Sequence, residues 1–280
     1  MPSLILEGGT FRPIFSAGVM DALLDNDIMF PYCIGVSAGI TNGFSYLSKQ
    51  KRRNLDILES YRNDKRYLSI KNFFKCKSLF GLDFIFDEIP NKLSPFDMDT
   101  FLKYNGTALV GVTNAITGQT EYLDGKTIDE KCTILRATCA IPLFFPAIRI
   151  NNNYYYDGGI CDPIPIQKAI TDGNEKHLII LTRPKGYRKQ FSRKNLFASK
   201  ILNKKYPELN NSLINRHRLY NEQVEFCEKL EREGKAIILR PEENQSIESF
   251  EKNIDKLREG YFNGYNLAIE KMDEIKNLFL

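Results

Sequence analysis

Histidine is scarce in this sequence, and several common functional motifs are missing from it. Only His177 and His217 occur among the 280 residues. The six cysteines show no C-x-x-C spacing, and there is no zinc, phosphate-loop or dinucleotide-binding motif. We therefore expect neither a metal nor another cofactor. Several cysteines lie inside apolar runs, so we expect them to be reduced and buried.

Long apolar runs and a strong charge bias are also absent. No stretch has the length that a membrane-spanning helix needs, and residues 3–6 begin an apolar run with no basic leader before it. The net charge of +4 is too small to indicate nucleic acid as a partner. We expect a cytoplasmic protein that binds no nucleic acid and is either free or peripheral at the inner face of the membrane.

Short apolar runs alternate with helical patterns along most of the chain. The runs that predict strands lie at residues 3–7, 34–36, 108–112, 120–123, 148–150, 154–156, 177–182 and 236–239. The main helical patterns lie at residues 13–24, 38–49, 209–233 and 246–278, with interruptions of the last expected near Gly260 and Gly264. This alternation predicts one α/β domain over residues 1–280 with three α/β/α layers and a mainly parallel central sheet. Residues 187–280 are expected to form a mainly helical C-terminal part.

A serine flanked by glycines stands where a predicted strand meets a predicted helix. The segment Gly35-Val36-Ser37-Ala38-Gly39 has the form G-x-S-x-G, which in this context predicts a tight turn. Such a turn holds the serine hydroxyl at a helix N-terminus, where backbone N–H groups and the helix dipole favour negative charge. Ser37 is therefore a candidate nucleophile, with Gly35 and Gly39 shaping the turn. The alternative is a structural corner that holds an inert serine.

A glycine loop follows the first predicted strand and precedes Pro13, which suits a first helical turn. This loop offers unpaired backbone N–H groups and one positive charge, as an anion or oxyanion site requires. A plain strand-to-helix turn is the alternative. The candidate residues are Gly8, Gly9, Thr10, Phe11 and Arg12.

An aspartate followed by two glycines ends the predicted hairpin at residues 148–156. Asp157 is a candidate catalytic carboxylate, because Gly158 and Gly159 let other backbone approach it; an ordinary Asp-Gly turn is the alternative. The serine turn, the glycine loop and Asp157 each follow a predicted strand. Since the carboxyl ends of parallel strands share one edge of a sheet, we expect the three to meet there.

Neither histidine is well placed to act as the base. His177 begins its predicted strand and is therefore expected at the edge of the sheet opposite Ser37. His217 lies among charged residues on a predicted helix. A Ser-Asp-His arrangement would need one of them, so Asp157 would have to accept the serine proton itself. An unperturbed aspartate has a pKa near 3.9, and partial burial beside Ser37 would raise it.

Two further segments combine cations with apolar residues. Residues 67–96 interleave phenylalanines with lysines, which indicates a lid over an apolar pocket, a membrane-contact segment or aromatic side chains packed into the core. Residues 183–205 are strongly basic, which indicates either a solvated helix face or contact with an anionic membrane.

Together these motifs resemble those of the patatin-like phospholipase family. The family pattern is G-G-G-x-[KR]-G, then G-x-S-x-G, then D-G-[GA], and it corresponds to residues 8–13, 35–39 and 157–159 in the same order and at similar separations. Residues 137–142 and 157–165 also resemble single-domain bacterial members. The resemblance extends along nearly the whole chain and implies a patatin-like fold. It also implies that Ser37 and Asp157 form a two-residue dyad that hydrolyses lipid esters through an acyl-enzyme, without metal.

The sequence departs from the family pattern at two positions. Thr10 replaces the third glycine and resists a positive φ, while Pro13 replaces the last glycine and has no N–H. A donor needed at position 13 would be lost, at about 10²–10³ in rate. Arg12 either shapes the loop, faces a lipid phosphate or forms a structural ion pair. The leading hypothesis is a serine esterase of the phospholipase A type; the alternatives are an acyltransferase and a catalytically weakened lipid-binding or regulatory protein.

Overall fold

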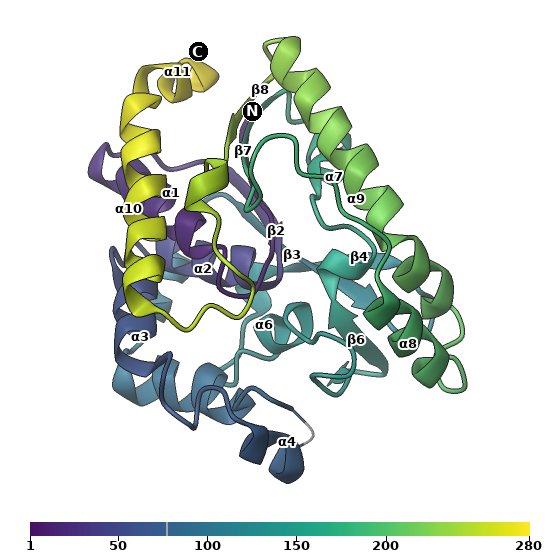
Figure 1. Cartoon of the computed structure of the whole chain (residues 1–280). Helices are drawn as coiled ribbons and strands as arrows, with labels where there is room; N and C mark the ends of the chain where they lie inside the picture. Colours follow the sequence, from purple (N-terminus) through teal and green to yellow (C-terminus); the bar gives the residue numbers. More distant parts are fainter. Residues whose placement is uncertain (77) are drawn as a thin grey trace.

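The computed structural model describes residues 1–76 and 78–280 and contains one eight-stranded sheet with helices on both faces (Figure 1). The strand order is β5-β6-β3-β2-β1-β7-β8, and β4 pairs with β3 outside this path. The strands are β1 (Pro2–Leu6), β2 (Tyr32–Val36), β3 (Thr107–Asn114), β4 (Thr120–Asp124), β5 (Ile148–Ile150), β6 (Asn153–Asp157), β7 (Lys176–Ile180) and β8 (Ala236–Leu239).

The centre of the sheet is parallel and the end that carries β4, β5 and β6 is antiparallel. Strands β3, β2, β1, β7 and β8 run parallel to one another, with Ile5 of β1 beside Ile34 of β2 and Ile179 of β7. All five residues of β2 are buried, because both faces of the sheet are covered. This double burial explains why the strands are near-continuous apolar runs in the sequence.

Eleven α-helices are present in the described part of the chain, joined by one π-helix and several short 3₁₀ turns. The π-helix is η1 (Phe84–Leu93). The α-helices are α1 (Ile14–Asp25), α2 (Ser37–Leu47), α3 (Arg53–Tyr61), α4 (Ile70–Cys76), α5 (Met98–Leu102), α6 (Thr133–Thr138), α7 (Ile166–Thr171), α8 (Arg193–Leu202), α9 (Leu209–Arg232), α10 (Ile254–Glu270) and α11 (Met272–Lys276).

The side chains of β1 show how the sheet is sandwiched. Leu4 and Leu6 point into a core shared with α1, α2, α10 and α11, whereas Ile5 points into a second core shared with α7 and α9. Successive side chains of a strand face opposite sides of a sheet, so β1 contributes to both cores. In Figure 1, α1 and α10 accordingly lie on one side of the sheet and α7 and α9 on the other. The predicted three-layer α/β/α class with a mainly parallel sheet is confirmed.

The last long helix differs from its prediction at residues 246–278. Helix α10 begins at Ile254, because the Asn253 side chain accepts a hydrogen bond from the Asp255 N–H at 2.9 Å and so caps the helix. Residues before Asn253 form a loop that reaches the glycine loop. The expected interruptions near Gly260 and Gly264 are also wrong, since α10 is continuous through both positions. The packing at Gly264 shows what the glycine does instead. An added Cβ there would lie 2.0 Å from the Phe15 carbonyl oxygen, so the missing side chain lets α10 pack against α1.

Within the described residues, we find no helix that combines the length and the apolar composition needed to cross a bilayer.

Candidate active site

Ser37 occupies a strained turn between β2 and α2. Its φ is +55°, a left-handed conformation that costs a residue other than glycine on the order of 1–3 kcal/mol. The Ser37 N–H donates to Thr138 Oγ1 at 2.8 Å, and the Thr138 hydroxyl donates to the Gly111 carbonyl of β3 at 2.6 Å. These bonds fasten the strained backbone to the neighbouring strand. They also show that the Ser37 N–H is not available as an oxyanion donor.

Asp157 lies at the end of β6, beside the serine turn. The expected geometry was wrong in one respect, because β6 is antiparallel to β3 and its carboxyl end does not belong to the parallel edge. The register of the strands brings Asp157 to the site instead. Asp157 of β6 pairs with Val112 of β3. Gly111, the residue before Val112, pairs with Val36 of β2, which precedes Ser37. The Asp157 carboxyl accepts the Gly159 N–H at 2.8 Å, and its carbonyl accepts the Thr113 hydroxyl at 2.9 Å.

The carboxyl of Asp157 is buried and lies next to the hydroxyl of Ser37. Burial raises the pKa of Asp157; the nearby Ser37 hydroxyl, the Arg216 guanidinium and the Gly159 N–H partly offset this rise. A carboxylate with a raised pKa is a stronger base than a free aspartate. The thiol of Cys139 also contacts Ser37, but burial raises its pKa to about 12, so it stays neutral.

The glycine loop lies directly against the nucleophile. A Cβ added at Gly8 would lie 2.8 Å from the Ser37 Cβ, so only glycine lets the loop approach this closely. Similar close approaches occur at Gly35, Gly39 and Gly158, whose added Cβ atoms would lie within 3.0 Å of neighbouring strands or backbone.

Three of the five predicted oxyanion residues keep free N–H groups. In the part of the chain that the structure describes, the N–H groups of Gly8, Gly9 and Thr10 have no acceptor. The N–H of Phe11 donates to the Ser249 carbonyl at 3.4 Å, and that of Arg12 donates to the Gly9 carbonyl at 3.2 Å. The N–H groups of Phe11 and Arg12 are therefore engaged within the protein, and the assignment of residues 8–12 to an oxyanion site stays a prediction.

The two unusual residues of the loop have different consequences. Thr10 adopts a φ of +59°, although its branched side chain disfavours this conformation. The backbone at Thr10 thus has a conformation that glycine usually adopts, although the residue carries a hydroxyl. Pro13 directly precedes α1, with a φ of −63°. The free N–H groups belong to residues 8–10, so the missing N–H of Pro13 removes none of these donors.

The buried side chain of Arg12 packs against the glycine loop. Its side chain is 8% exposed, its Nε donates to Thr182 Oγ1 at 3.2 Å, and its Nη1 donates to the Ser249 hydroxyl. Burial lowers the pKa of Arg12 to about 10, with the Glu7 carboxylate opposing this effect. The guanidinium also lies where a side chain on Gly9 would stand. No ion-pair partner of Arg12 is found among residues 1–76 and 78–280.

Two open cavities meet at Ser37. The first is lined mainly by apolar side chains, including Phe11, Ile57, Phe80, Phe86, Leu135 and Phe145. The second is lined by Asp157, the glycine loop and several cations. Ser37, Thr10 and Ile141 belong to both walls. Ser37 therefore faces an apolar space on one side and a polar, basic space on the other.

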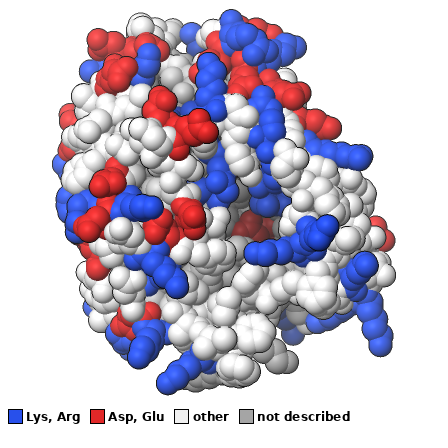
Figure 2. Space-filling model, in the orientation of Figure 1, with Lys and Arg blue, Asp and Glu red and all other residues white. Residues whose placement is uncertain are grey.

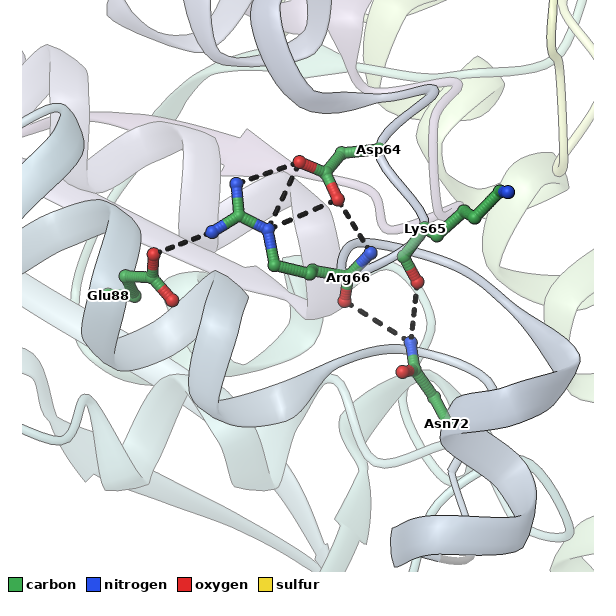
Figure 3. A network of polar contacts seen from close by, with 5 residues as sticks. All are labelled: Asp64, Lys65, Arg66, Asn72 and Glu88. Atoms are coloured by element: carbon green, nitrogen blue, oxygen red, sulfur yellow. Dashed lines mark hydrogen bonds and ion pairs between the residues drawn. The ribbon is translucent and has the colours of Figure 1, made fainter.

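The segment at residues 67–96, for which the sequence predicts a lid, a membrane contact or packing into the core, has both buried and exposed aromatic side chains. Phe80 and Phe86 are buried and line the apolar cavity, whereas Phe74 is 82% exposed on α4. The segment is fastened at its start by Arg66, which pairs with Asp64 and with Glu88 of η1, both at 2.8 Å (Figure 3). Such exposed pairs stabilise weakly, so they orient the segment more than they lock it. Lys77 of this prediction lies outside the described residues.

The histidines lie where the sequence places them. His177 Nδ1 is 2.7 Å from the Ser3 hydroxyl at the start of β1 and β7, and burial lowers its pKa to about 4. His217 Nδ1 faces the Ile214 carbonyl at 3.1 Å. Neither residue lines the two cavities. Among the described residues, no group of three or more His, Cys, Asp or Glu is arranged to hold a metal ion.

The sequence did not reveal that cations of the basic segment at residues 183–205 face a cavity. We expected a solvated helix face or a membrane contact, but Arg183, Lys189 and Lys194 line the second cavity. The run of cations was visible in the sequence, whereas its position opposite the glycine loop depends on how α8 and α9 pack. Thr138 was also missed as a support of Ser37, because its role rests on a contact across 101 residues of chain.

Comparisons with known proteins give matches over both parts of the chain. A family model described as patatin-like phospholipase matches residues 4–170, and one described as a domain of unknown function, DUF6363, matches residues 206–280. The chain is 27% identical over 187 residues to "Uncharacterized protein YjjU" of Escherichia coli (strain K12), covering 65% of this chain and 52% of that protein.

A second curated protein and a solved structure are also similar. The chain is 27% identical over 195 residues to "Probable lipid hydrolase 463L" of Invertebrate iridescent virus 6, covering 62% of this chain and 65% of that protein. The crystal structure of VipD from Legionella pneumophila matches with a TM-score of 0.48 and 14% identity, over 97% of this chain and 66% of that one. The matches thus span between about half and two thirds of the length of these proteins.

Proposed function

Because the chain belongs to the patatin-like phospholipase family, we propose that it is a serine lipid acyl hydrolase of the phospholipase A type, which uses Ser37 as nucleophile and Asp157 as base. The observation that carries this proposal is the position of Ser37, in its strained turn, next to the buried carboxyl of Asp157 at the wall of one cavity. The name of the viral relative, a probable lipid hydrolase, agrees with this chemistry.

In the first half of the reaction, the Ser37 hydroxyl gives its proton to Asp157 while Oγ bonds to the carbonyl carbon of the ester. The carbonyl oxygen becomes an oxyanion, and the free N–H groups of Gly8, Gly9 and Thr10 are the donors available to it. The bond from carbon to the alcohol oxygen then breaks. The departing alcohol takes the proton from Asp157, which leaves an acyl group on Ser37.

In the second half, Asp157 removes a proton from water as the water oxygen bonds to the acyl carbon. The bond to Ser37 Oγ breaks, Oγ recovers the proton from Asp157, and the fatty acid leaves. A positioned base typically contributes 10²–10⁴ in rate, and one oxyanion donor contributes about 10²–10³. The raised pKa of Asp157 helps the base because proton transfer from a hydroxyl becomes less unfavourable.

A fluorophosphonate probe on the full chain tests this proposal. We expect one adduct per chain by intact mass, mapped to the peptide that contains Ser37, because the probe needs an activated serine beside an oxyanion site. Folded protein without any adduct would contradict the proposal and favour a weakened lipid-binding protein. Free fatty acid as the product indicates hydrolysis, whereas acyl transfer to added glycerol indicates an acyltransferase.

We also propose that α4 contacts an anionic membrane surface. Ile70 is 69% exposed and Phe74 is 82% exposed, one helical turn apart on the same face, and Lys71 is exposed between them. Apolar side chains beside cations suit a lipid interface. The segment that follows α4 lines the apolar cavity, so contact there would bring lipid close to the entrance.

Replacing both Ile70 and Phe74 by serine should weaken binding to anionic vesicles about tenfold or more, since each apolar side chain loses a transfer free energy of about 1–3 kcal/mol. Co-sedimentation with phosphatidylglycerol vesicles measures this change. Phe262→Ser is the matched control, because Phe262 is 42% exposed but belongs to α10. Equal vesicle binding of the double variant and wild type would exclude α4 as the contact.

A further inference from the structure

The second cavity carries more positive than negative side chains. Its wall contains Arg12, Arg183, Lys189, Lys194 and Arg216, against the two carboxyl groups of Glu7 and Asp157. Figure 2 shows lysine and arginine side chains gathered around a hollow near the middle of the face drawn. The charged residues of this wall come from four separate stretches of the chain, so it is the fold that brings them together.

Arg183 and Lys189 face this cavity and form no ion pair within the described residues. Arg183 stacks on Tyr187, with 4.6 Å between its guanidinium carbon and the ring centre, and its buried Nε has no partner among the described residues. The Lys189 ammonium lies 4.5 Å from the centre of the Tyr220 ring and forms no ion pair in the described part of the chain. Unpaired cations next to a cavity favour an anionic occupant.

The nearby carboxyl groups have other partners. Glu7 accepts the Thr182 N–H at 2.6 Å and lies near the Tyr220 hydroxyl. The Asp157 carboxyl accepts the Gly159 N–H and lies next to the Ser37 hydroxyl. Desolvation, together with the charges of Arg216, Arg12 and Arg183 and only partly opposed by Glu7, lowers the pKa of Lys189 to about 7. A bound anion would therefore offset both the burial of the Lys189 ammonium and its repulsion by the neighbouring arginines.

We infer that the second cavity is a subsite for a phosphate-type anionic group of the acyl substrate, held by Lys189 and Arg183 with Lys194 at the rim. The inference rests on the proposed hydrolase function of Ser37. With the ester at Ser37, the acyl chain occupies the apolar cavity and the anionic group of the alcohol portion occupies the basic one. Both cavities share Ser37 and Thr10, so one molecule can span them.

This subsite gives the C-terminal part of the chain a role at the active site. Arg216 and Tyr220 belong to α9, inside the segment that matches the domain of unknown function. The Arg216 Nε donates to the Gly159 carbonyl, which ties α9 to the turn after Asp157. Tyr220 supports Lys189 through its ring. Residues 206–280 thus form one wall of the substrate cavity.

The test compares two substrates that differ only in a phosphate: oleoyl lysophosphatidic acid and oleoyl monoacylglycerol. Wild type should show the higher kcat/KM on lysophosphatidic acid. Lys189→Gln or Arg183→Gln should reduce the ratio of the two kcat/KM values about tenfold, as loss of one charge-assisted hydrogen bond predicts. Lys200→Gln, an exposed position on α8 with the same charge change, should leave the ratio unchanged.

Inorganic phosphate distinguishes a lipid headgroup from a free anion as the occupant. A substrate preference that depends on Lys189 assigns the site to the headgroup. Phosphate inhibition that depends on Lys189, without such a preference, assigns it to a free anion. The inference is overturned if Lys189→Gln changes neither property or lowers turnover of both substrates equally. If wild type hydrolyses neither substrate, the proposed function fails, and calorimetric titration of phosphate into wild type and Lys189→Gln still tests the subsite.

Discussion

Replacing Ser37 by alanine is expected to lower ester hydrolysis by about 10⁴-fold or more, because no other group can form the acyl-enzyme. Ser37 lines both cavities, and its hydroxyl lies next to the Asp157 carboxyl. Fatty acid release from phospholipid and from lysophospholipid measures the loss. Binding of substrate should persist, since neither cavity wall is otherwise altered.

Two further variants separate a chemical effect from a folding effect. Ser37→Gly should lose activity to the same extent but unfold at a higher temperature than Ser37→Ala, because glycine accepts a φ of +55° without strain. Ser16→Ala is the matched control. Ser16 is a fully buried serine of α1 whose hydroxyl has no partner in the described chain, so activity should not change. Full activity of Ser37→Ala would falsify the nucleophile assignment.

Replacing Asp157 by asparagine is expected to reduce kcat by about 10²–10⁴, the usual contribution of a general base. Asparagine can still accept the Gly159 N–H, so the turn should keep its shape while the proton acceptor is lost. In wild type, the rate should fall as the pH drops through the raised pKa of Asp157. The remaining activity of the variant should lack this acidic limb. An unchanged acidic limb in the variant would assign the base to another group.

The same substitution should stabilise the folded protein at neutral pH. The pKa of Asp157 is raised by folding above its ordinary value of 3.8, so the folded state favours the protonated carboxyl. The stability linked to that proton is fully present below the unfolded pKa and is lost as the pH rises through the folded pKa. Asparagine carries no charge, so Asp157→Asn should exceed wild type in unfolding free energy at pH 8, with the difference shrinking towards pH 4.

Urea denaturation at both pH values measures this difference. Asp99→Asn, an exposed aspartate of α5, is the control and should show no comparable gain at pH 8. A variant less stable than wild type at pH 8 would mean that the Asp157 carboxylate stabilises the fold. Higher stability together with lower activity is the pattern expected where a buried charge is kept for chemistry.

The sheet and the serine turn could be predicted because their signals are local. A buried strand needs a short apolar run, and a tight turn needs glycine, so β1, β2 and Ser37 can be found from neighbouring residues alone. The order of the motifs along the chain also indicated the family. The assignment of residues 1–280 to one domain stays a prediction, although β8 shares the sheet with β1.

The features that escaped prediction depend on contacts between distant segments. Strand β6 runs antiparallel to β3. The spacing of apolar residues predicts a strand at β6, but it does not reveal which strand lies beside it or in which direction it runs. The late start of α10 depends on the Asn253 cap and on the loop before it, which bonds to Phe11 and Arg12. The inward direction of Lys189 depends on α9, since a lysine in a basic run is usually solvated.

The contact between α1 and α10 limits how this protein can be shortened. A Cβ added at Gly18 of α1 would lie 1.9 Å from the Tyr261 carbonyl oxygen of α10, so the two backbones touch. The α1 surface at Gly18 therefore fits the bare backbone of α10. A shortened chain that kept only residues 4–170 would expose this surface. It would also lose β7 and β8, and with them the strand beside β1, so a substitute for α10 alone would not complete the fold.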